Sequence, residues 1–498
     1  MRLEGLYLYF GQGLDEAANE KARARLHALL RRPLPGVTDL ILGYASLYIE
    51  YDTERVTRRR VERWARAAEE APPPGRRVEI PVVYDGPDLK AVADWAGLSL
   101  DEVIRRHAAG RYRVFALGFT PGFPFMGVVE PALQKPRLPV PRPEVPAHAV
   151  GIAGPQTGVY PMKSPGGWNL IGRARVRVYD PGRAEPFLLA PGDEVRFVPN
   201  AGAVPSEPEG LELLPEKPRH PFLRVEQAGL LDLVVDRGRF LSGRFGLARS
   251  GPLDPYSAAL ASRLVGNPAG GTVLEVNLKG PELVALQAGV VGFAGYGLWL
   301  AVNGEVYPPA QTVRVFPGDR LTLLPRGRGA RAYLALPGGV EHGVFFGSRS
   351  VDLRGKIGRP LRSGDVLGSL RPPNAARPRA FAPWPLDEGV VRLRVQPGPQ
   401  ATPEAIRALT EQTFTVERAD RMGLRLQEGG VPGGEVTSEA VPIGAVQVPP
   451  GGRPMLLLAD RGTLGGYAKP LVVDPRDLWR AGQLRTGDRL RFVLDFGP

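Results

Sequence analysis

The sequence predicts a mainly β protein of several domains that begins with a small α/β domain, and three observations support this prediction. The chain has 498 residues, too many for one hydrophobic core, so three or four domains are expected. Its 63 Gly and 53 Pro are spread as single residues, which is typical of many short strands joined by defined turns. A Gly-Asp turn followed by an alternating strand occurs four times, which indicates related, duplicated β-barrels. The copies are APGDEVRFVP (190–199), FPGDRLTLLP (316–325), RSGDVLGSL (362–370) and RTGDRLRFVL (485–494).

The first 75 residues combine strands and helices. Strands are expected at 6–10 and 40–49, and the helix between them begins at Asp15, an N-cap residue followed by apolar residues at helical spacing. A second helix passes through Val56, Trp64 and Ala68 and ends at the sequence APPPG. This order predicts a small α/β domain of the βαβ type.

Two linkers rich in proline, at 200–221 and 371–389, divide the rest of the chain. We expect one barrel at 76–200, which includes a helix opened by Ser99 and Glu102 and a strand at 173–180. Two further barrels are expected at 221–371 and 389–498. Their helices begin in LDPYSAALASRLVG and VDPRDLWRAGQ, where Asp is the cap and Pro stands in the first turn.

Composition excludes several classes of site. The chain has no cysteine and five histidines, so disulfides, thiolate metal sites and a cysteine nucleophile are excluded, and no metal site is evident. The net charge of +12 comes from arginines interleaved with acidic residues, which favours a solvated surface suited to high temperature over a nucleic-acid groove.

No targeting or membrane segment is expected. The N-terminus lacks the pattern of a signal peptide, so a cytoplasmic location is expected. Residues 283–302 are uncharged, but four glycines interrupt them, and an Asn303-Gly304 hairpin turn follows. We therefore predict β-structure there, with no membrane partner and no nucleic-acid partner.

The residues that could perform chemistry are framed by glycine. The sequence has no GxxxxGK[ST] phosphate loop, no HExxH, no GxSxG and no biotin-attachment domain. Three Gly-rich stretches remain: GFTPGFPFMG (118–127), GIAGPQTGVYPMKSPGGWNLIG (151–172) and LLLADRGTLGGYAKP (456–470). Glycine lets the backbone approach a ligand closely, although rigid turns with satisfied polar groups remain the alternative. The candidate side chains in the second and third stretches are Gln156, Tyr160, Lys163, Trp168, Asp460, Tyr467 and Lys469.

These stretches also carry a family resemblance. The first half resembles the B subunit of 5-oxoprolinase, also called KipI or allophanate hydrolase subunit 1. The resemblance is carried by residues 118–127, PRPEVPAHAVGIAGPQTGVYPMKSPGGWNLIG and PGDEVRF. The second half resembles the C subunit of the same enzyme, also called KipA or allophanate hydrolase subunit 2. Its motifs include VVDRGRFLSGRFGLARSGPLDPYSAALASRLVG, FGSRSVDLRG, DRMGLRL, VPIGAVQVPPGGRPMLLLAD and GGYAKP. The order suggests a natural B–C fusion.

The resemblance implies tandem cyclophilin-like β-barrels preceded by a small α/β domain. It implies a component that opens 5-oxoproline to glutamate, with ATP and a separate A subunit of the LamB/YcsF type. Two alternatives stay open: a carboxyltransferase module acting on carboxybiotin and a urea-like amide, and a regulatory binder of a histidine kinase. The oligomeric state, including a homo-oligomer, also stays open.

The resemblance also assigns roles to residues. Asp460 is expected to be a proton acceptor or a charge stabiliser, and Lys469 and Arg421 are expected to offset negative charge on carboxylate or phosphate. A polar substrate is expected to bind Gln156 and Tyr160, and Lys163, Trp168, Glu275 and Tyr467 complete the set. The chain departs from the family where a glutamine is replaced by Val235, and where the usual Asp-x-Gln-Thr-Thr-Gly-Gly-Tyr-Pro contains Gly462, Leu464 and Ala468. These losses put the substrate, and catalysis itself, in question.

Overall fold

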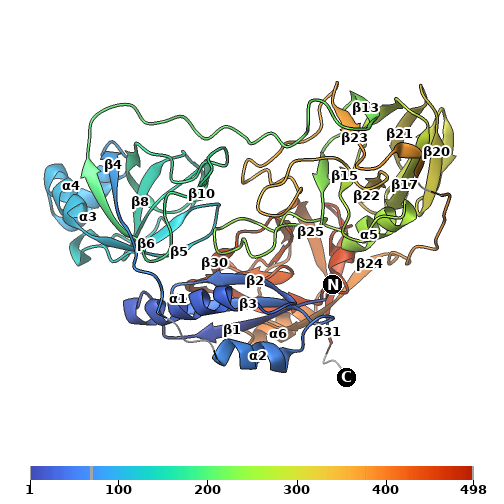
Figure 1. Cartoon of the computed structure of the whole chain (residues 1–498). Helices are drawn as coiled ribbons and strands as arrows, with labels where there is room; N and C mark the ends of the chain where they lie inside the picture. Colours follow the sequence, from blue (N-terminus) through green and yellow to red (C-terminus); the bar gives the residue numbers. More distant parts are fainter. Residues whose placement is uncertain (1, 68–70, 376, 496–498) are drawn as a thin grey trace.

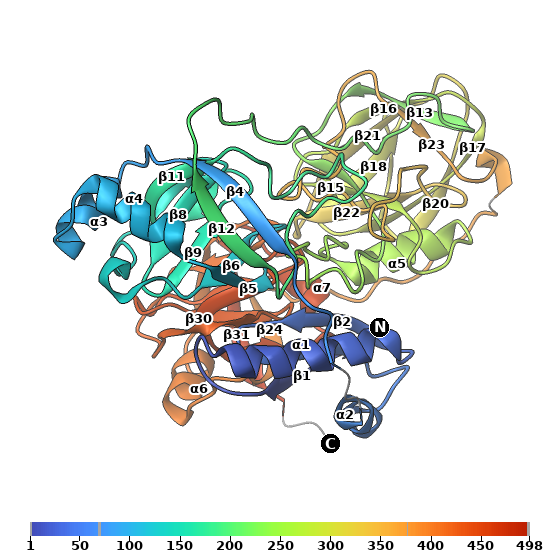
Figure 2. The same ribbon diagram turned by 60° about the vertical axis from the view of Figure 1, so that its left-hand side comes forward.

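The computed structural model describes residues 2–67, 71–375 and 377–495, so Ala68 lies outside the described residues. The chain forms four parts in sequence order. The first barrel and the 221–371 part form two upper lobes, and the second barrel and the α/β domain lie beneath them (Figures 1 and 2). This arrangement confirms the predicted fold class, a mainly β protein with two closed seven-stranded barrels and an N-terminal α/β region.

The N-terminal domain is an antiparallel sheet covered by helices. The strand order is β1-β3-β2, and β1 and β2 both pair antiparallel with β3. They therefore run parallel to each other, and α1 connects them across β3, which forms the expected βαβ crossover with a third strand between its two strands. The expected strand at 40–49 is two strands, because a hairpin turn at 43–45 separates them. Asp15 caps the first helix as predicted, accepting from the amides of Ala17 and Ala18 at 2.9 and 3.1 Å. The elements are β1 (Leu3–Tyr9), α1 (Glu16–Arg31), β2 (Val37–Leu42), β3 (Ser46–Asp52) and α2 (Arg58–Arg66).

The first barrel closes in the order β11-β4-β12-β5-β6-β9-β8. Ser99 caps its second helix, accepting from the Glu102 amide at 3.2 Å. The expected strand at 173–180 ends at Ala174, because Arg175 and Arg177 turn toward the linker and donate to the carbonyls of Ala203 and Ser206. The elements are β4 (Arg77–Val83), α3 (Leu89–Ala96), α4 (Leu100–Ala109), β5 (Tyr112–Leu117), β6 (Pro124–Gly127), η1 (Pro131–Leu133), β7 (Arg142–Val145), β8 (Ala149–Ala153), β9 (Gln156–Val159), β10 (Ser164–Gly166), β11 (Asn169–Ala174) and β12 (Glu194–Pro199).

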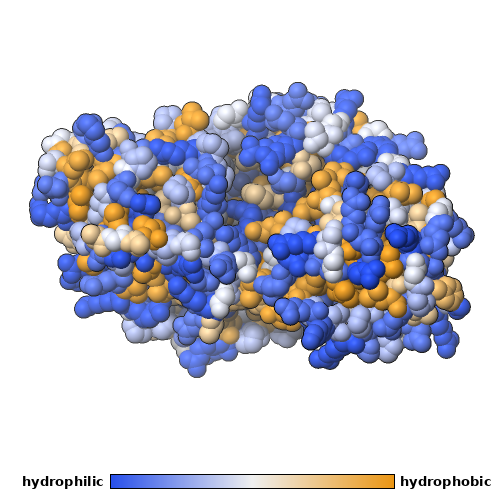
Figure 3. Space-filling model, turned by 90° about the horizontal axis from the view of Figure 1, so that it is seen from above, coloured by the Kyte–Doolittle hydropathy of each residue, from blue (hydrophilic) through white to orange (hydrophobic). Residues whose placement is uncertain are grey.

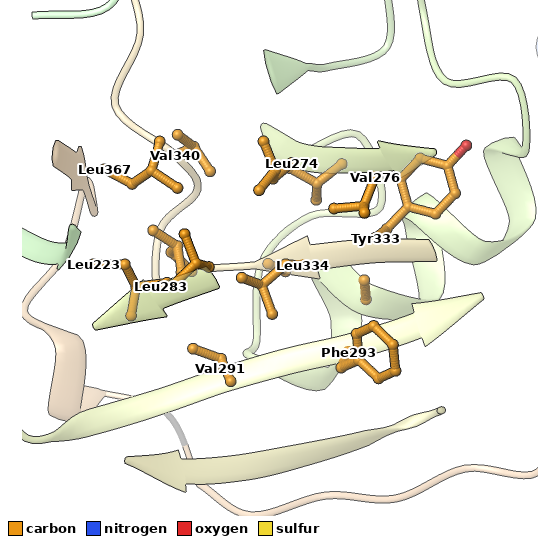
Figure 4. Close-up of a cluster of buried hydrophobic side chains, with 14 of the residues drawn as sticks. Leu223, Leu274, Val276, Leu283, Val291, Phe293, Tyr333, Leu334, Val340 and Leu367 are labelled. Carbon is orange, nitrogen blue, oxygen red and sulfur yellow. The ribbon is translucent and has the colours of Figure 1, made fainter. Parts of the chain in front are cut away.

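Residues 221–371, for which a barrel is expected, pair as two sheets around one core. Figure 4 shows side chains of both sheets, such as Leu223, Leu274 and Phe293, pointing toward one another. The six-stranded sheet contains β19 (Glu305–Tyr307), β18 (Leu298–Val302), β21 (Arg320–Pro325), β16 (Glu282–Ala285), β13 (Pro221–Gln227) and β23 (Val366–Gly368). The five-stranded sheet contains β14 (Asp232–Val235), β15 (Val273–Asn277), β22 (Arg331–Ala335), β17 (Gly289–Gly295) and β20 (Gln311–Val315).

Local predictions in this part are confirmed. Residues 283–302 form β16, β17 and β18, and no helix in the described parts of the chain is long and apolar enough to cross a membrane. Asn303 and Gly304 turn β18 into β19 with φ of 50° and 89°. Asp254 caps helix α5 (Pro255–Leu264), accepting from the Ser257 amide at 2.8 Å, and Pro255 begins the helix.

The second barrel repeats the first. Its strands pair as β24-β31-β25-β26-β29-β28-β30, and β24 closes the ring on β30. In each barrel the first strand pairs in parallel with the last, β4 with β12 and β24 with β31. The predicted helix in VDPRDLWRAGQ is shorter than expected and begins after Asp477. The elements are β24 (Val390–Pro397), α6 (Pro403–Thr410), β25 (Phe414–Ala419), β26 (Gly423–Leu426), β27 (Glu435–Ala440), β28 (Ala445–Val448), β29 (Met455–Leu457), β30 (Leu464–Val473), α7 (Leu478–Ala481) and β31 (Arg489–Leu494), with η2 (Pro373–Ala375) in the preceding linker.

The four Gly-Asp turns share one geometry. Each glycine has φ between 89° and 97°, and each aspartate accepts a hydrogen bond from the backbone amide three residues earlier. Two of the turns open the last strand of a barrel, β12 and β31, and the other two open β21 and β23. Both barrel interiors are filled by apolar side chains, so the polar site lies outside them.

Candidate functional site

Arg421 is the centre of a buried ion cluster between the second barrel and the 221–371 part. Its Nε donates to Asp460 Oδ2 at 2.8 Å and its Nη2 to Asp460 Oδ1 at 3.1 Å, while Nη1 donates to Glu275. All three side chains are at most 5 % exposed. Arg421 lies in the turn between β25 and β26, where the Asp420 carboxylate accepts from the amide of Met422 at 2.8 Å. The fold thus brings together three residues that the sequence analysis named.

The three ionisable groups differ in protonation. Burial acts to lower the pKa of Arg421, but Asp460 and Glu275 outweigh it and raise that pKa. Burial also acts to raise the pKa of Glu275, and the charges of Arg421 and Arg331 reverse this and lower it. The pKa of Asp460 is raised by burial, although Arg421 opposes the shift. Arg421 and Glu275 are therefore held charged, and Asp460 is the carboxylate of this cluster that accepts a proton most readily.

Arg354 connects this cluster to the first barrel. Its guanidinium donates to the carbonyl oxygen of Asp460 at 3.4 Å and to that of Phe119, in the loop 118–123, at 3.3 Å. A Cβ atom at Gly462 would lie 3.0 Å from the Phe119 carbonyl oxygen, so glycine lets the two loops approach closely. Gly462 stands where the resemblance expects a glutamine. At this position the backbones of the two halves approach each other closely.

Lys469 belongs to a second buried network. Its Nζ lies 3.0 Å from Glu439 Oε1, and Glu439 also accepts from Gln400 at 2.7 Å and from the Tyr9 hydroxyl at 3.0 Å. Burial lowers the pKa of Lys469, although Glu439 opposes the shift. In the described structure the ion-pair partner of Lys469 is Glu439 rather than Asp460. Tyr467, on the same strand, accepts from Lys469 Nζ through its carbonyl oxygen at 3.3 Å.

The stretch 151–172 lies apart from the Arg421 cluster. Tyr160 and Trp168 are buried in an aromatic cluster with Phe123, their ring centroids 5.1 and 5.4 Å from its ring. Gln156 accepts from the Tyr44 hydroxyl of the α/β domain at 2.8 Å. Lys163 is exposed and pairs with Glu144 at 2.6 Å. The glycines of this stretch serve close packing within the first barrel, where a Cβ atom at Gly158 would lie 2.8 Å from the Pro124 carbonyl oxygen and one at Gly172 would lie 2.5 Å from that of Val83.

Sequence reasoning missed several buried charged residues. Arg354 lies in the motif FGSRSVDLRG, and Arg461 directly follows Asp460, but neither was singled out. The signal in the sequence was arginine within closely packed, Gly-rich motifs. An arginine that such a motif buries needs a partner, because charged side chains are rarely buried unpaired. The other missed residues are Arg239, Arg249 and Glu439, each at most 6 % exposed.

The molecular surface is hollowed between the two upper lobes (Figure 3). A cavity of about 400 Å³ lies instead on the outside of the first barrel, lined by Ile104, Ala108 and Arg196. A smaller one of about 120 Å³ is lined by Pro87, Pro146 and other residues near the start of α3. Among the described residues, no group of His, Asp and Glu is arranged to hold a metal ion.

Comparisons with known proteins identify both halves. The family model for the carboxyltransferase domain, subdomain C and D, matches residues 2–189, and the model for subdomain A and B matches residues 245–494. The B subunit of the 5-oxoprolinase of Bacillus subtilis (strain 168) is 41% identical over 211 residues, which cover 39% of this chain and 88% of that protein. The C subunit of the 5-oxoprolinase of Escherichia coli (strain K12) is 30% identical over 289 residues, which cover 55% of this chain and 91% of that protein.

A solved structure has the same architecture over the whole chain. The crystal structure of the protein TTHA0988 is 56% identical, has a TM-score of 0.95, and aligns with 99% of this chain and 100% of its own. The halves that resemble the B and C subunits therefore occur together in one polypeptide of known fold. This chain belongs to the carboxyltransferase-domain family of the B and C subunits of 5-oxoprolinase, as a fusion of the two.

Proposed function

We propose that this chain is the B–C component of an ATP-dependent 5-oxoprolinase that acts in the cytoplasm with a separate A subunit of the LamB/YcsF type. The observation that carries the proposal is the meeting of the two halves at Asp460. The half that resembles the B subunit reaches this residue through the Phe119 carbonyl, which shares the Arg354 guanidinium with the Asp460 carbonyl. A reaction that needs both halves is expected to use residues at the place where they touch.

The chain's own residues suit proton transfer and charge stabilisation. Asp460 would accept a proton from the water that attacks the lactam carbonyl carbon and deliver it to the ring nitrogen as the C–N bond breaks, because its pKa is raised by burial. Arg421 would remain charged and stabilise negative charge that develops beside it. Lys469, whose pKa is lowered by burial, would act with its partner Glu439 as a second proton carrier.

ATP would supply the free energy of ring opening by activating the lactam carbonyl oxygen. The sequence has no phosphate loop, and its contribution to ATP would therefore come from side chains such as the buried arginines. Arg239 fits this requirement, because its Nε and Nη1 have no hydrogen-bond partner in the described protein. Substrate positioning is assigned to Gln156, Tyr160, Lys163, Trp168 and Tyr467, as the family resemblance implies.

The test is glutamate release from 5-oxoproline and ATP by the purified chain, with and without a homologue of the A subunit from the same source. Release that requires both proteins, and that falls in Asp460→Asn, is the expected result. If the complex forms but releases no glutamate, the substrate is an amide other than 5-oxoproline. Absence of both complex and turnover would overturn the proposal and favour the regulatory binder.

A second candidate function follows from the family description, which names a carboxyltransferase domain. In that reaction the chain would transfer a carboxyl group from carboxybiotin to an amide. Since the described chain carries no biotin-attachment domain, a separate biotin carrier would be required. Avidin distinguishes the two functions: it would abolish carboxyl transfer in a cell extract and leave 5-oxoproline-dependent glutamate release unchanged.

A further inference from the structure

Three loops from different parts of the chain meet next to Asp460, and we call their meeting place the junction. They are residues 118–123, 238–251 and 460–464. The amide of Gly122 donates to the Phe245 carbonyl at 2.9 Å, and the amide of Ser250 donates to the Ala459 carbonyl at 3.2 Å. The α/β domain closes the junction from below, where the Asp39 carboxylate accepts from the Gly243 amide at 3.2 Å.

The junction contains an unusual concentration of unsatisfied polar atoms. A buried polar atom without a hydrogen bond destabilises the folded state, so native proteins contain few of them. Each buried polar atom that lacks a partner within the protein calls for an explanation, such as strain, a catalytic role or a bound water or ion. Arg239 has two such atoms, as described above. The other buried polar atoms of the junction loops that lack a partner in the described structure are Thr120 Oγ1, Ser242 Oγ, Arg249 Nε and Nη1, Ser250 Oγ, Arg461 Nη1 and Thr463 Oγ1.

The chemistry of these atoms selects the ligand. Guanidinium nitrogens only donate, and hydroxyl groups donate as readily as they accept, so the complementary ligand carries acceptor oxygens. Arg461 donates Nε to the Val441 carbonyl at 2.7 Å, and no carboxylate of the described residues lies within ion-pair distance of it. Charged and polar groups that face Arg461 at longer range are Glu50, Arg249, Tyr48 and Asp39.

The two acids near Arg461 are already engaged. Glu50 accepts from the Thr38 hydroxyl at 2.7 Å and from Arg249 Nη2, and Asp39 accepts from the backbone amides of Leu40 and Gly243. Neither carboxylate occupies the free donors of Arg461 or the remaining donors of Arg249. A carboxylate from outside would bind both, since guanidinium groups pair with carboxylates in a charge-assisted geometry.

Backbone strain supports a functional purpose for the junction. Phe119, Leu241 and Ser250 have φ of 64°, 54° and 53°, a left-handed conformation that favours glycine. Residues in this strained conformation cluster at active sites and ligand sites, where the surrounding structure holds them in place. All three belong to loops that present the unsatisfied donors.

We propose that the junction binds a small carboxylate, held by Arg461 and Arg249 with the hydroxyl groups of Thr463 and Ser250. This inference rests on the proposed function, which supplies the choice of 5-oxoproline as the probe. It assigns the carboxylate of 5-oxoproline to the junction and its lactam ring to the neighbouring Asp460 loop. The ligand replaces no existing ion pair, because the donors that it uses are unpartnered in the described protein.

The probe is 5-oxoproline, titrated calorimetrically into the whole purified chain without ATP or any further protein. The comparison probe is 2-pyrrolidinone, which has the same ring but no carboxylate. We expect 5-oxoproline to bind about tenfold or more tightly than 2-pyrrolidinone, and Arg461→Gln to lose about tenfold in affinity. Arg418→Gln, which removes an exposed arginine paired with Asp420, is the matched control and keeps the affinity of the wild type.

A second variant separates ligand binding from folding. The Thr463 hydroxyl has no hydrogen-bond partner among the residues that the structure describes, so Thr463→Val is expected to keep or raise the Tm and to weaken 5-oxoproline binding about threefold or more. The matched Thr157→Val removes a hydroxyl that donates to the Gly151 carbonyl at 3.0 Å, and it is expected to lower the Tm without changing affinity.

The possible results separate this inference from the proposed function. Equal binding of the two probes, absence of 5-oxoproline binding, or unchanged affinity in both Arg461→Gln and Thr463→Val would overturn the carboxylate site. Binding that depends on Arg461, combined with no glutamate release when the A subunit is present, would keep the site and overturn the proposed reaction. Glutamate release with a KM that neither variant changes would keep the proposed reaction and overturn the carboxylate site.

Discussion

The Arg421 guanidinium contacts both carboxylate oxygens of Asp460, at 2.8 and 3.1 Å, and reaches Glu275 of the neighbouring part with its remaining nitrogen. One cation thus links two carboxylates from two parts of the chain. A buried cluster of this kind costs desolvation energy, and replacement by apolar residues is often neutral or stabilising. The cluster is therefore weak evidence for a role in stability, and the proposed function assigns it a role in chemistry at Asp460 instead.

Asp460→Asn is expected to reduce glutamate release about 100-fold or more, because the amide cannot accept the proton. The free energy of unfolding should fall by about 2 kcal/mol, since Arg421 keeps Glu275 but loses a charge-assisted contact. Assays with a saturating concentration of the A subunit and urea denaturation measure the two effects. Glu417→Gln, at an exposed position, is the control, and wild-type activity of Asp460→Asn would remove Asp460 from the mechanism.

The Arg249–Glu50 ion pair is expected to hold the α/β domain against loop 238–251. Both side chains are at most 5 % exposed. Arg249→Met and Glu50→Gln should each lower the free energy of unfolding by about 3–5 kcal/mol, since each leaves a buried charge unpaired. The double variant should lose less than the sum of the two, with a coupling energy of about 0.5–3 kcal/mol. Strict additivity in urea denaturation would contradict the pairing.

Asp39 is expected to make stability depend on pH. Burial, with help from Glu50, raises the pKa of Asp39 from 3.8 to about 6, against the opposing charge of Arg249. The folded state therefore binds this proton more tightly than the unfolded state. The contribution of this proton to the free energy of unfolding is present in full below pH 3.8 and is lost as the pH rises through about 6.

Asp39→Asn tests this dependence, because asparagine keeps an acceptor oxygen and does not titrate. At pH 7 the variant should be more stable than the wild type by up to about 3 kcal/mol, and the difference should shrink toward pH 4. Urea denaturation of both proteins at pH 4, 5, 6 and 7 measures the difference. A difference that does not change with pH would show that Asp39 does not titrate in this range.

Lys163 and Trp168 are expected to separate surface from core in the stretch 151–172. Lys163→Ala removes an exposed ion pair and should change the free energy of unfolding by less than about 0.5 kcal/mol, so its effect on glutamate release tests the proposed role of Lys163 in substrate positioning. Trp168→Ala should cost about 3–5 kcal/mol, since the side chain is buried among aromatic rings. A selective loss of activity in Lys163→Ala would place substrate over this stretch.

Local features of the fold were predictable from sequence. Asp15, Ser99 and Asp254 cap helices as expected, and Asn303 and Gly304 form the expected hairpin turn. The strand at 40–49 and the helix after Asp474 were less well predicted. A hairpin divides the first, and in the second the Asp474 carboxylate is held by Arg476 instead of capping a helix.

The candidate site was predicted in part. Asp460, Arg421 and Glu275 meet, but Lys469 pairs with Glu439, and Tyr160 and Trp168 enter an aromatic core. Glycine-rich framing looks the same in a sequence whether the backbone approaches a ligand or another part of the protein. Only the packing partner distinguishes these cases, and at Gly462 that partner is the Phe119 carbonyl.

By itself, the sequence determined the mainly β class, the repeated Gly-Asp turns, the helix caps and the order of the two halves. These features depend on residues within a few positions of one another, so their physics is local. The tertiary structure alone decided that Arg421 meets Glu275, 146 positions away, and that Arg354 joins Asp460 to Phe119. Contacts of this kind arise from the packing of four parts around one buried junction, because burial leaves each charge only the partners that the fold places beside it.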